Sequence, residues 1–329
     1  RLCGGDADLE KAVPALMRAL DLPPDAKIVE TPMSRMLREE TGGAVDFSRW
    51  LLIKLVQLPP IERETVEAFA AKLRGNSLVA HIEPDYDVCG IHKETPEKKP
   101  QPDSVSDDRI IPDDTLFRLQ YYHELIQTPK AWKITTGSEE VTVAVLDSGC
   151  NGDLEDFSGR VLAGYDFVKD SPCAGDDQGH GTAITSLIGA TGNNKKGIAG
   201  MDWRCRILPI NAASSGVAAW AQAVEYATHA GARVLNISAR LDVPEPSELL
   251  EAALADAAAK EVTIVVSAGN QGEAHVAWPA SSKHVIAVGA VDAFDRRWSD
   301  PVERDASNYG PGLDLVAPGA EIVALGKDG

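Results

Sequence analysis

Two segments of the chain place an acid and a base where they could act together on a nucleophile. Asp147 follows an apolar run at 143–146 that predicts a strand, so its carboxylate emerges at the strand end. His180 lies between Gly179 and Gly181, before an apolar segment that predicts a helix. An ionised carboxylate at a strand end needs a donor, which an imidazolium supplies. The pair therefore predicts two members of a nucleophilic triad, with His180 as general base and Asp147 fixing its tautomer.

Longer motifs include these two residues, and other motifs follow further along the chain. They are Asp147-Ser148-Gly149, Gly179-His180-Gly181-Thr182, Ser267-Ala268-Gly269-Asn270, Ser307-Asn308-Tyr309-Gly310 and Ala317-Pro318-Gly319. The Asp-then-His order, about thirty residues apart, is that of subtilisin. In type and order the motifs resemble those of the subtilase family, over residues 45–329. The resemblance implies a subtilisin-like serine endopeptidase that hydrolyses peptide bonds through an acyl-enzyme.

The resemblance also assigns residues to substrate binding. It implies that the Asn270 side chain donates to the tetrahedral oxyanion, with an Asn that only caps a turn as the alternative. It implies that the strand before Ser238 pairs with an extended substrate. The expected substrate-binding residues are Ser238, Ala239, Arg240, Ser267, Ala268 and Gly269. Arg240 stands where the family usually has glycine, which favours a narrowed pocket, an acidic substrate residue or merely a solvated cation.

A structural calcium site is a further implication of the resemblance. Asp156 and Asn193 match the carboxylate and the loop asparagine of that site, and Gln120 is a further oxygen donor. Oxygen ligands supplied by a loop suit Ca²⁺. Lys195 and Lys196 in the same loop depart from the family pattern.

The family's nucleophile belongs to a Gly-Thr-Ser motif, which does not follow Ala317-Pro318-Gly319 within these residues. We expect the parent gene to encode this motif shortly after Gly329, and the 329-residue chain alone to be inactive. The alternative is a catalytically inactive binding or scaffold protein that kept the fold, which Arg240 favours. The joint presence of Asp147, His180 and Asn270 favours the enzyme, since nothing structural requires all three. A nucleotide-binding enzyme is excluded, because no glycine-rich phosphate loop follows the first strand of this region.

Strands and helices that must position these residues alternate along the chain. Strands are predicted over 141–146, 206–210, 234–237, 263–267 and 285–288, and helices over 182–190, 217–229 and 248–260. This alternation predicts an α/β fold with a doubly wound parallel sheet, covered by helices on both faces. Ligands in such sheets bind beyond the carboxyl ends of the strands, where Asp147, Ser238 and Asn270 fall.

Four parts are expected along the sequence. Residues 1–44 carry a helical pattern of unknown role, and residues 110–329 form the catalytic domain, without the part that carries the nucleophile. Residues 91–109 are polar and form a linker that we expect to be cleavable.

Residues 45–90 resemble the small α/β inhibitor-like propeptide domain of subtilases. Strands are predicted at 49–55 and 78–86, with a helix at 62–73 between them. The family uses this domain to chaperone folding and to block the cleft, which implies a zymogen. An unrelated ferredoxin-like module is the alternative.

Composition narrows the range of partners. The formal net charge is −18, and phosphate binding needs clustered Lys and Arg, so no nucleic acid partner is expected. No apolar run reaches the roughly 20 residues needed to span a bilayer, so no membrane partner is expected. The expected partners are a protein or peptide substrate and the chain's own propeptide, acting as an intramolecular inhibitor.

Cysteine usage bears on the compartment. Cys150 and Cys173 both lie in loops between the Asp147 and His180 motifs. Either they form a disulfide, which would indicate an oxidising compartment, or both are free thiols. The expected localisation is secreted or lumenal.

Overall fold

The computed structural model describes residues 26–30, 51–55, 109–241, 243, 245–300 and 305–329. The chain divides into two units, Arg1–Asp85 and Tyr86–Gly329, which are described separately. In the first unit β1 (Ala26–Glu30) pairs antiparallel with β2 (Leu51–Leu55). The strand predicted at 49–55 is therefore present as β2, whereas β1 was not expected. The predicted helix at 62–73, the strand at 78–86 and the linker up to residue 108 lie outside the described residues.

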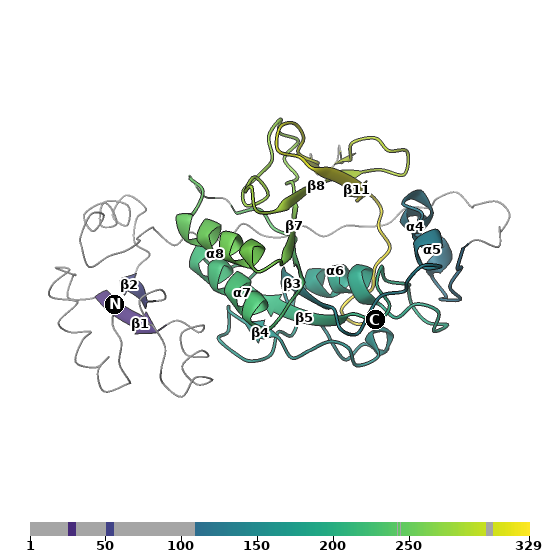
Figure 1. Ribbon diagram of the computed structural model, residues 1–329, viewed down its shortest axis with the longest axis horizontal. Helices are drawn as coiled ribbons and strands as arrows, with labels where there is room; N and C mark the ends of the chain where they lie inside the picture. The colour runs from purple at the N-terminus through teal and green to yellow at the C-terminus, as the bar shows by residue number, and fades with distance from the viewer. Residues whose placement is uncertain (1–25, 31–50, 56–108, 242, 244, 301–304) are drawn as a thin grey trace. The chain divides into compact units, whose positions relative to one another are not determined.

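A seven-stranded parallel sheet lies at the centre of the second unit, in the order β11-β8-β7-β6-β3-β5-β4 (Figure 1). Its strands are β3 (Thr142–Asp147), β4 (Tyr165–Asp166), β5 (Arg206–Asn211), β6 (Val234–Ile237), β7 (Thr263–Ser267), β8 (Ile286–Val291) and β11 (Leu315–Pro318). All five predicted strands are present, and the parallel sheet is confirmed. The edge strands β4 and β11 were missed, because β4 has only two residues and β11 is exposed to half-buried without the alternation of a core strand. A separate antiparallel pair joins β9 (Ser299–Asp300) to β10 (Asp305–Ala306).

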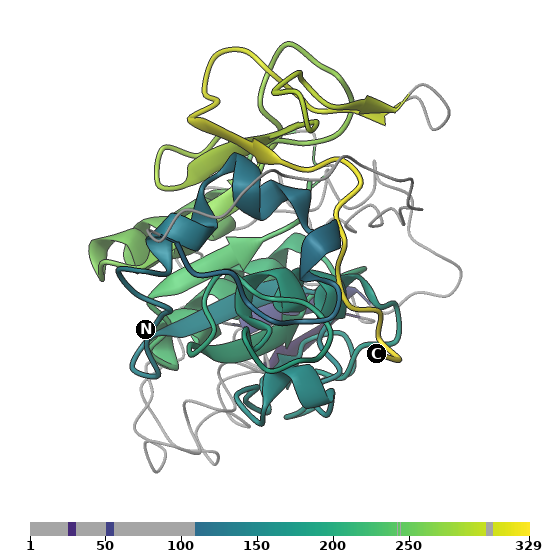
Figure 2. The same cartoon turned by 90° about the vertical axis from the view of Figure 1, so that its right-hand side faces the viewer.

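Helices connect these strands and cover the sheet. They are α4 (Tyr121–Leu125), α5 (Thr128–Ala131), α6 (His180–Gly189), α7 (Val217–His229) and α8 (Glu248–Ala259), with short 3₁₀ turns η2 (Phe117–Leu119) and η3 (Glu155–Phe157). The crossover through α6 leads from β4 to β5, and those through α7 and α8 lead on to β6 and β7, so all three step towards β11. Helix α6 lies on one face of the sheet, and α7 with α8 lie on the other (Figures 1 and 2).

The two faces of the sheet differ in how far they are covered. Under α6, Val143 and Val145 pack with Phe157 and Ile207 in a buried cluster. The strand register places Asn236, Val265 and Ile286 in line with Val145, on this same face, yet all three are only half-buried. Their neighbours on the other face are buried, among them Leu235, Ile264 and Ala287. Within the described residues, the expected cover on both faces is therefore found over β3 and β5 but is incomplete over β6 to β8.

A histidine that no motif predicted lies in the core next to α5. His123 is fully buried against the rings of Phe117 and Trp132. Its Nε2 donates to the Ala199 carbonyl at 2.9 Å, while its Nδ1 has no hydrogen-bond partner in the part of the chain that the structure describes. Burial lowers the pKa of His123 from 6.5 to about 4, because protonation would leave a charged ring in an apolar site.

Acid is expected to destabilise this fold through His123. As the pH falls below 6.5, His123 becomes protonated in the unfolded chain, whereas in the native chain it stays neutral down to about pH 4. The free energy of unfolding should therefore fall across this window, by on the order of 3 kcal/mol. Urea denaturation across that pH range measures the fall. His123→Phe should remove this dependence of the unfolding free energy on pH. A His123→Phe protein with the same pH dependence as the wild type would contradict the assignment. His275→Asn, which changes an exposed histidine, is the control.

Candidate active site

The predicted acid and base lie in direct contact. Asp147 ends β3 and is fully buried, and the His180 Nδ1 lies 2.8 Å from its Oδ1 and 2.9 Å from its Oδ2. Because a carboxylate only accepts, Nδ1 carries the proton and the neutral ring keeps Nε2 as an acceptor. The backbone N–H of Ser148 donates to Asp147 Oδ1 at 2.7 Å. The arrangement can take a proton at Nε2 and stabilise the imidazolium that results.

Glycines allow the two elements to approach this closely. A Cβ on Gly181 would lie 2.0 Å from the carbonyl oxygen of Gly149, so no larger residue fits at the second position of α6. Gly149 itself has φ of 100°, in the region that favours glycine. The Asp-Ser-Gly and Gly-His-Gly motifs thus describe one close contact between β3 and α6.

Most of the predicted substrate-binding residues line one cavity, of about 240 Å³, at the carboxyl ends of β6, β7, β8 and β11. They are Ser238, Ser267, Ala268 and Gly269, and the predicted oxyanion donor Asn270 lines the same cavity. The Asn270 side chain is exposed, as a donor to a bound group must be. Ala239 is buried and Arg240 is half-buried, and neither lines this cavity.

Asn308 supports the Asn270 loop and was noted in the sequence only as part of a motif. It is almost fully buried, and its Oδ1 accepts from the backbone N–H groups of Gln271 and Glu273, both at 3.0 Å. Its own N–H donates to the Gly269 carbonyl at 2.8 Å. The segment around Asn308 therefore fixes the backbone of the loop that presents Asn270.

The residues predicted to bind calcium are only partly brought together. Asp156 is buried, but the neighbour of its carboxylate is Asn194, whose Nδ2 donates to Oδ1 at 2.6 Å. Asn193 instead accepts from the Asp113 N–H, at 3.3 Å. The Gln120 amide is occupied elsewhere, since its two ends bond the backbone of Ala199. In this structure the asparagine that contacts Asp156 is therefore Asn194, the neighbour of the predicted Asn193.

Asp114 is a buried carboxylate that sequence reasoning missed at this site. Its Oδ2 accepts from the Asn193 N–H at 2.6 Å, while its Oδ1 is buried without a hydrogen-bond partner among the described residues. Burial raises the pKa of Asp114, and the negative charge of Asp156 raises it further. No ion pair joins either carboxylate to a cationic side chain in the part of the chain that the structure describes. An orphaned buried oxygen beside a second carboxylate fits a bound cation.

Such a cation would need oxygen donors other than carboxylates. Among the described residues, no group of three or more His, Cys, Asp or Glu side chains could hold a metal ion. The amide of Asn194 and the carbonyls of the loop at 192–198 are the available further donors, and amide and carbonyl oxygens suit Ca²⁺. Asp114, Asp156 and Asn194 are therefore the side chains that fit this ion.

The thiols of Cys150 and Cys173 are free in this structure. Their loops do meet, because the Cys150 N–H donates to the Ala174 carbonyl at 2.8 Å. However, Cys150 is buried in the core cluster beside Phe157, and Cys173 is exposed. Of the two states left open by the sequence, the structure therefore has the free thiols, and the indication of an oxidising compartment is lost.

Sequence comparison decides the family. The model of the subtilase family matches residues 138–327. The chain belongs to the subtilase family. This subtilase is 36% identical over 264 residues to the thermophilic serine proteinase of Bacillus sp. (strain AK1), across 79% of this chain and 59% of that protein. It is 33% identical over 218 residues to thermitase of Thermoactinomyces vulgaris, across 65% of this chain and 75% of that enzyme.

A solved structure supports the same fold. The crystal structure of MycP1 with the N-terminal propeptide removed aligns with a TM-score of 0.54 and 28% identity, over 63% of this subtilase and 72% of that chain. The predicted subtilisin-like α/β fold is thereby confirmed. In the region that the structure describes, no helix has the length and apolar character to cross a membrane.

Proposed function

We propose that this subtilase is a subtilisin-like serine endopeptidase that acts on protein or peptide substrates. The observation that carries the proposal is the contact of buried Asp147 with His180 Nδ1, at 2.8 and 2.9 Å. A buried carboxylate that holds one tautomer of a partly exposed imidazole has a clear use in proton transfer. The names of the relatives, a thermophilic serine proteinase and thermitase, support this activity.

In the proposed reaction each polar group has a defined role. His180 Nε2 accepts the proton of a serine hydroxyl while the serine oxygen attacks the peptide carbonyl carbon. Asn270 donates its side-chain amide to the oxyanion, and Asp147 stabilises the imidazolium. When the C–N bond breaks, His180 returns the proton to the leaving amine. Water, activated by the same ring, then hydrolyses the acyl-enzyme.

The incompletely covered face of β6 to β8 supports a position for that serine next to the cavity. Val265, Ile286 and Val288 expose apolar surface beside the cavity that Asn270 lines. Apolar sheet faces require a covering layer. We propose that the Gly-Thr-Ser segment, encoded beyond residues 1–329, lies over this face and brings its hydroxyl between His180 and Asn270.

A fluorophosphonate probe, which reacts with activated serine hydroxyls, tests the proposal. The protein extended through the Gly-Thr-Ser segment should be labelled, and the 329 residues alone should not. His180→Ala in the extended protein should abolish labelling. An extended protein that has no serine there, or has one that does not react, would favour the inactive scaffold protein instead.

Loss of the oxyanion donor should lower turnover without disturbing the fold. Asn270→Ala is expected to reduce kcat by about 10²–10³-fold, the magnitude known for this donor in subtilisin. The reason is that the amide meets the substrate oxygen most closely once that oxygen becomes an anion. Steady-state kinetics on a chromogenic peptide measures the effect. Gln271→Ala, which alters the next side chain, should cost far less, and an equal loss would argue for a general disturbance of the loop.

Calcium is proposed as a structural ion of the same domain, held by Asp114, Asp156 and Asn194. An ion that binds only the native state adds about 2.7 kcal/mol to the unfolding free energy when its free concentration is about 100 times Kd. Excess chelator should therefore lower the melting temperature of the protein prepared with calcium.

Variants at the two carboxylates separate calcium from unrelated effects of chelation. Asp114→Asn or Asp156→Asn should remove the response to calcium. Asp113→Asn should keep it, since that exposed side chain accepts a bond from the Lys195 backbone and is the matched control. A melting temperature that chelation leaves unchanged would exclude the site.

The residues before the catalytic domain have proposed roles as well. We propose that residues 45–90 are an inhibitory propeptide, that the linker at 91–109 is cleaved, and that the enzyme is a secreted or lumenal zymogen. The antiparallel β1–β2 pair supports a small sheet in this region and includes part of segment 1–44, whose role is open. Limited proteolysis with mass spectrometry tests the linker, and cleavage confined to sites outside it would count against the proposal.

A further inference from the structure

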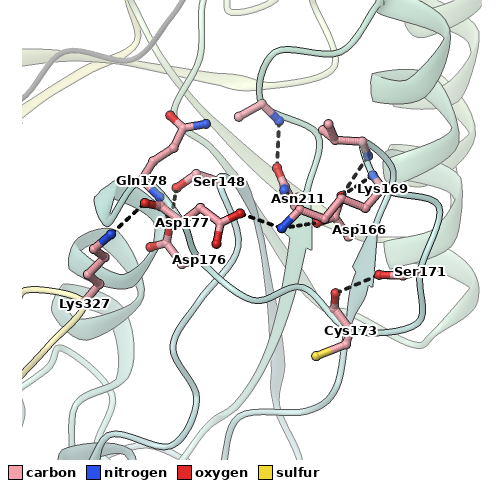
Figure 3. A network of polar contacts seen from close by, with 12 residues as sticks. Ser148, Asp166, Lys169, Ser171, Cys173, Asp176, Asp177, Gln178, Asn211 and Lys327 are labelled. Carbon is pink, nitrogen blue, oxygen red and sulfur yellow. Dashed lines mark hydrogen bonds and ion pairs between the residues drawn. The ribbon is translucent and has the colours of Figure 1, made fainter.

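The carboxylate of Asp176 accepts several hydrogen bonds at the start of α6, the helix that carries His180. Asp176 Oδ1 accepts from the Ser148 hydroxyl at 2.9 Å and from the backbone N–H groups of Gln178 and Gly179 at 3.0 and 2.7 Å. Asp176 Oδ2 accepts from the backbone N–H and the hydroxyl of Thr182, at 2.8 and 2.6 Å. Figure 3 shows Asp176 beside Ser148 within this network.

The chemistry of these contacts requires an ionised carboxylate. All five partners are donors, and they are divided between the two oxygens. An asparagine at position 176, in either orientation of its amide, would place its NH₂ group against hydrogen-bond donors. Gly179, the residue before α6, has no side chain to cap the helix, and Asp176 supplies that cap together with a negative charge at the helix N-terminus.

Ser148 connects this cap to the other partner of His180. Its hydroxyl donates to Asp176 and accepts from the Gly181 N–H at 2.9 Å, while its backbone N–H donates to Asp147 Oδ1 at 2.7 Å. Asp176 therefore holds both sides of the Asp147–His180 contact, through α6 on one side and through Ser148 on the other. Nothing in this path depends on a substrate.

We propose that Asp176 is a positioning residue that sets the His180 ring against Asp147. This inference rests on the proposed function, because it assigns Asp176 a part in the same reaction without contact to the substrate. Misplacement of a reacting group by about 1 Å can cost about 10²-fold in rate. We therefore expect Asp176→Asn to lower kcat of the full-length enzyme by about 10²-fold, with KM little changed.

The decisive measurement does not need activity. A proton shared between an imidazole Nδ1 and a carboxylate gives an NMR resonance far downfield of the amides. His180→Ala assigns this signal by removing it. Asp176→Asn in the full chain should shift or remove the signal although the protein stays folded. Asp177→Asn makes the same charge change one residue further on, in an exposed side chain paired with Lys169, and should leave the signal unchanged.

Each outcome decides for or against the inference. A folded Asp176→Asn protein whose downfield signal is unchanged would overturn it. If Asp176→Asn does not fold, Ser148→Ala decides: a shifted or lost signal supports positioning through the Ser148 hydroxyl, and an unchanged signal overturns it. Failure of the proposed function is distinguishable, since the wild-type protein would then lack serine-hydrolase labelling while its downfield signal still responded to Asp176.

Discussion

Replacing His180 by alanine is expected to lower kcat of the full-length enzyme by about 10⁶-fold, the loss known for the histidine of the subtilisin triad. The ring is the base that takes the proton of the nucleophile, and its Nδ1 is already committed to Asp147. KM should change little, because His180 does not line the cavity at the ends of β6 to β8. Initial rates on a chromogenic peptide, at matched amounts of folded enzyme, give both constants.

The control for this prediction is His275→Ala. His275 is an exposed histidine paired with Glu273. It should retain wild-type kinetics. A His180→Ala enzyme that loses less than about 10²-fold in kcat would show that another group serves as the base.

Elements with regular alternation or helical spacing of apolar residues were predicted most accurately from sequence. β6, β7 and α7 have the bounds that the apolar pattern predicts, because each runs through the core with regular spacing. The start of α6 was placed two residues late. The helix begins at His180 because Asp176 caps it from outside the apolar pattern, and such a cap depends on a side chain that folds back on the helix.

The loop at 192–198 shows why neighbouring residues of one type cannot be assigned to a role from sequence. Asn193 and Asn194 have the same chemistry, and the local backbone decides which one meets Asp156. Asn193 and Lys195 both have positive φ, of 60° and 66°, which turns Asn194 towards that carboxylate. Asp114 could not be found from spacing, because its partner Asn193 lies 79 residues away and only the fold joins them.

The motif around the predicted active site carried more information than its spacing alone. Asp147 and His180 were paired from residue types and order, and the structure places them in hydrogen-bond contact. Asn308 and Asp176 act one step further out, through backbone N–H groups of the loops that carry Asn270 and His180. Positioning of this kind leaves no distinctive sequence pattern, because an Asp or Asn that accepts from the backbone of a functional loop looks in the sequence like one in any other turn.

Replacing Asp147 by asparagine is expected to reduce kcat by about 10⁴-fold, as in the equivalent change of a serine protease triad. The Ser148 N–H needs an acceptor at the Oδ1 position. An asparagine that keeps its oxygen there must turn its NH₂ group towards His180. The imidazole would then accept at Nδ1 and carry its proton on Nε2, the wrong tautomer for a base.

A double variant separates this explanation from simple damage to the fold. If Asp147 acts only through the ring, Asp147→Asn should cost almost nothing more once His180 is alanine, because triad members act as a unit. The four proteins of the cycle, measured at matched folded concentration, supply the comparison. A further loss of about 10-fold or more in the double variant would mean that Asp147 contributes by another route, and the tautomer argument would fail.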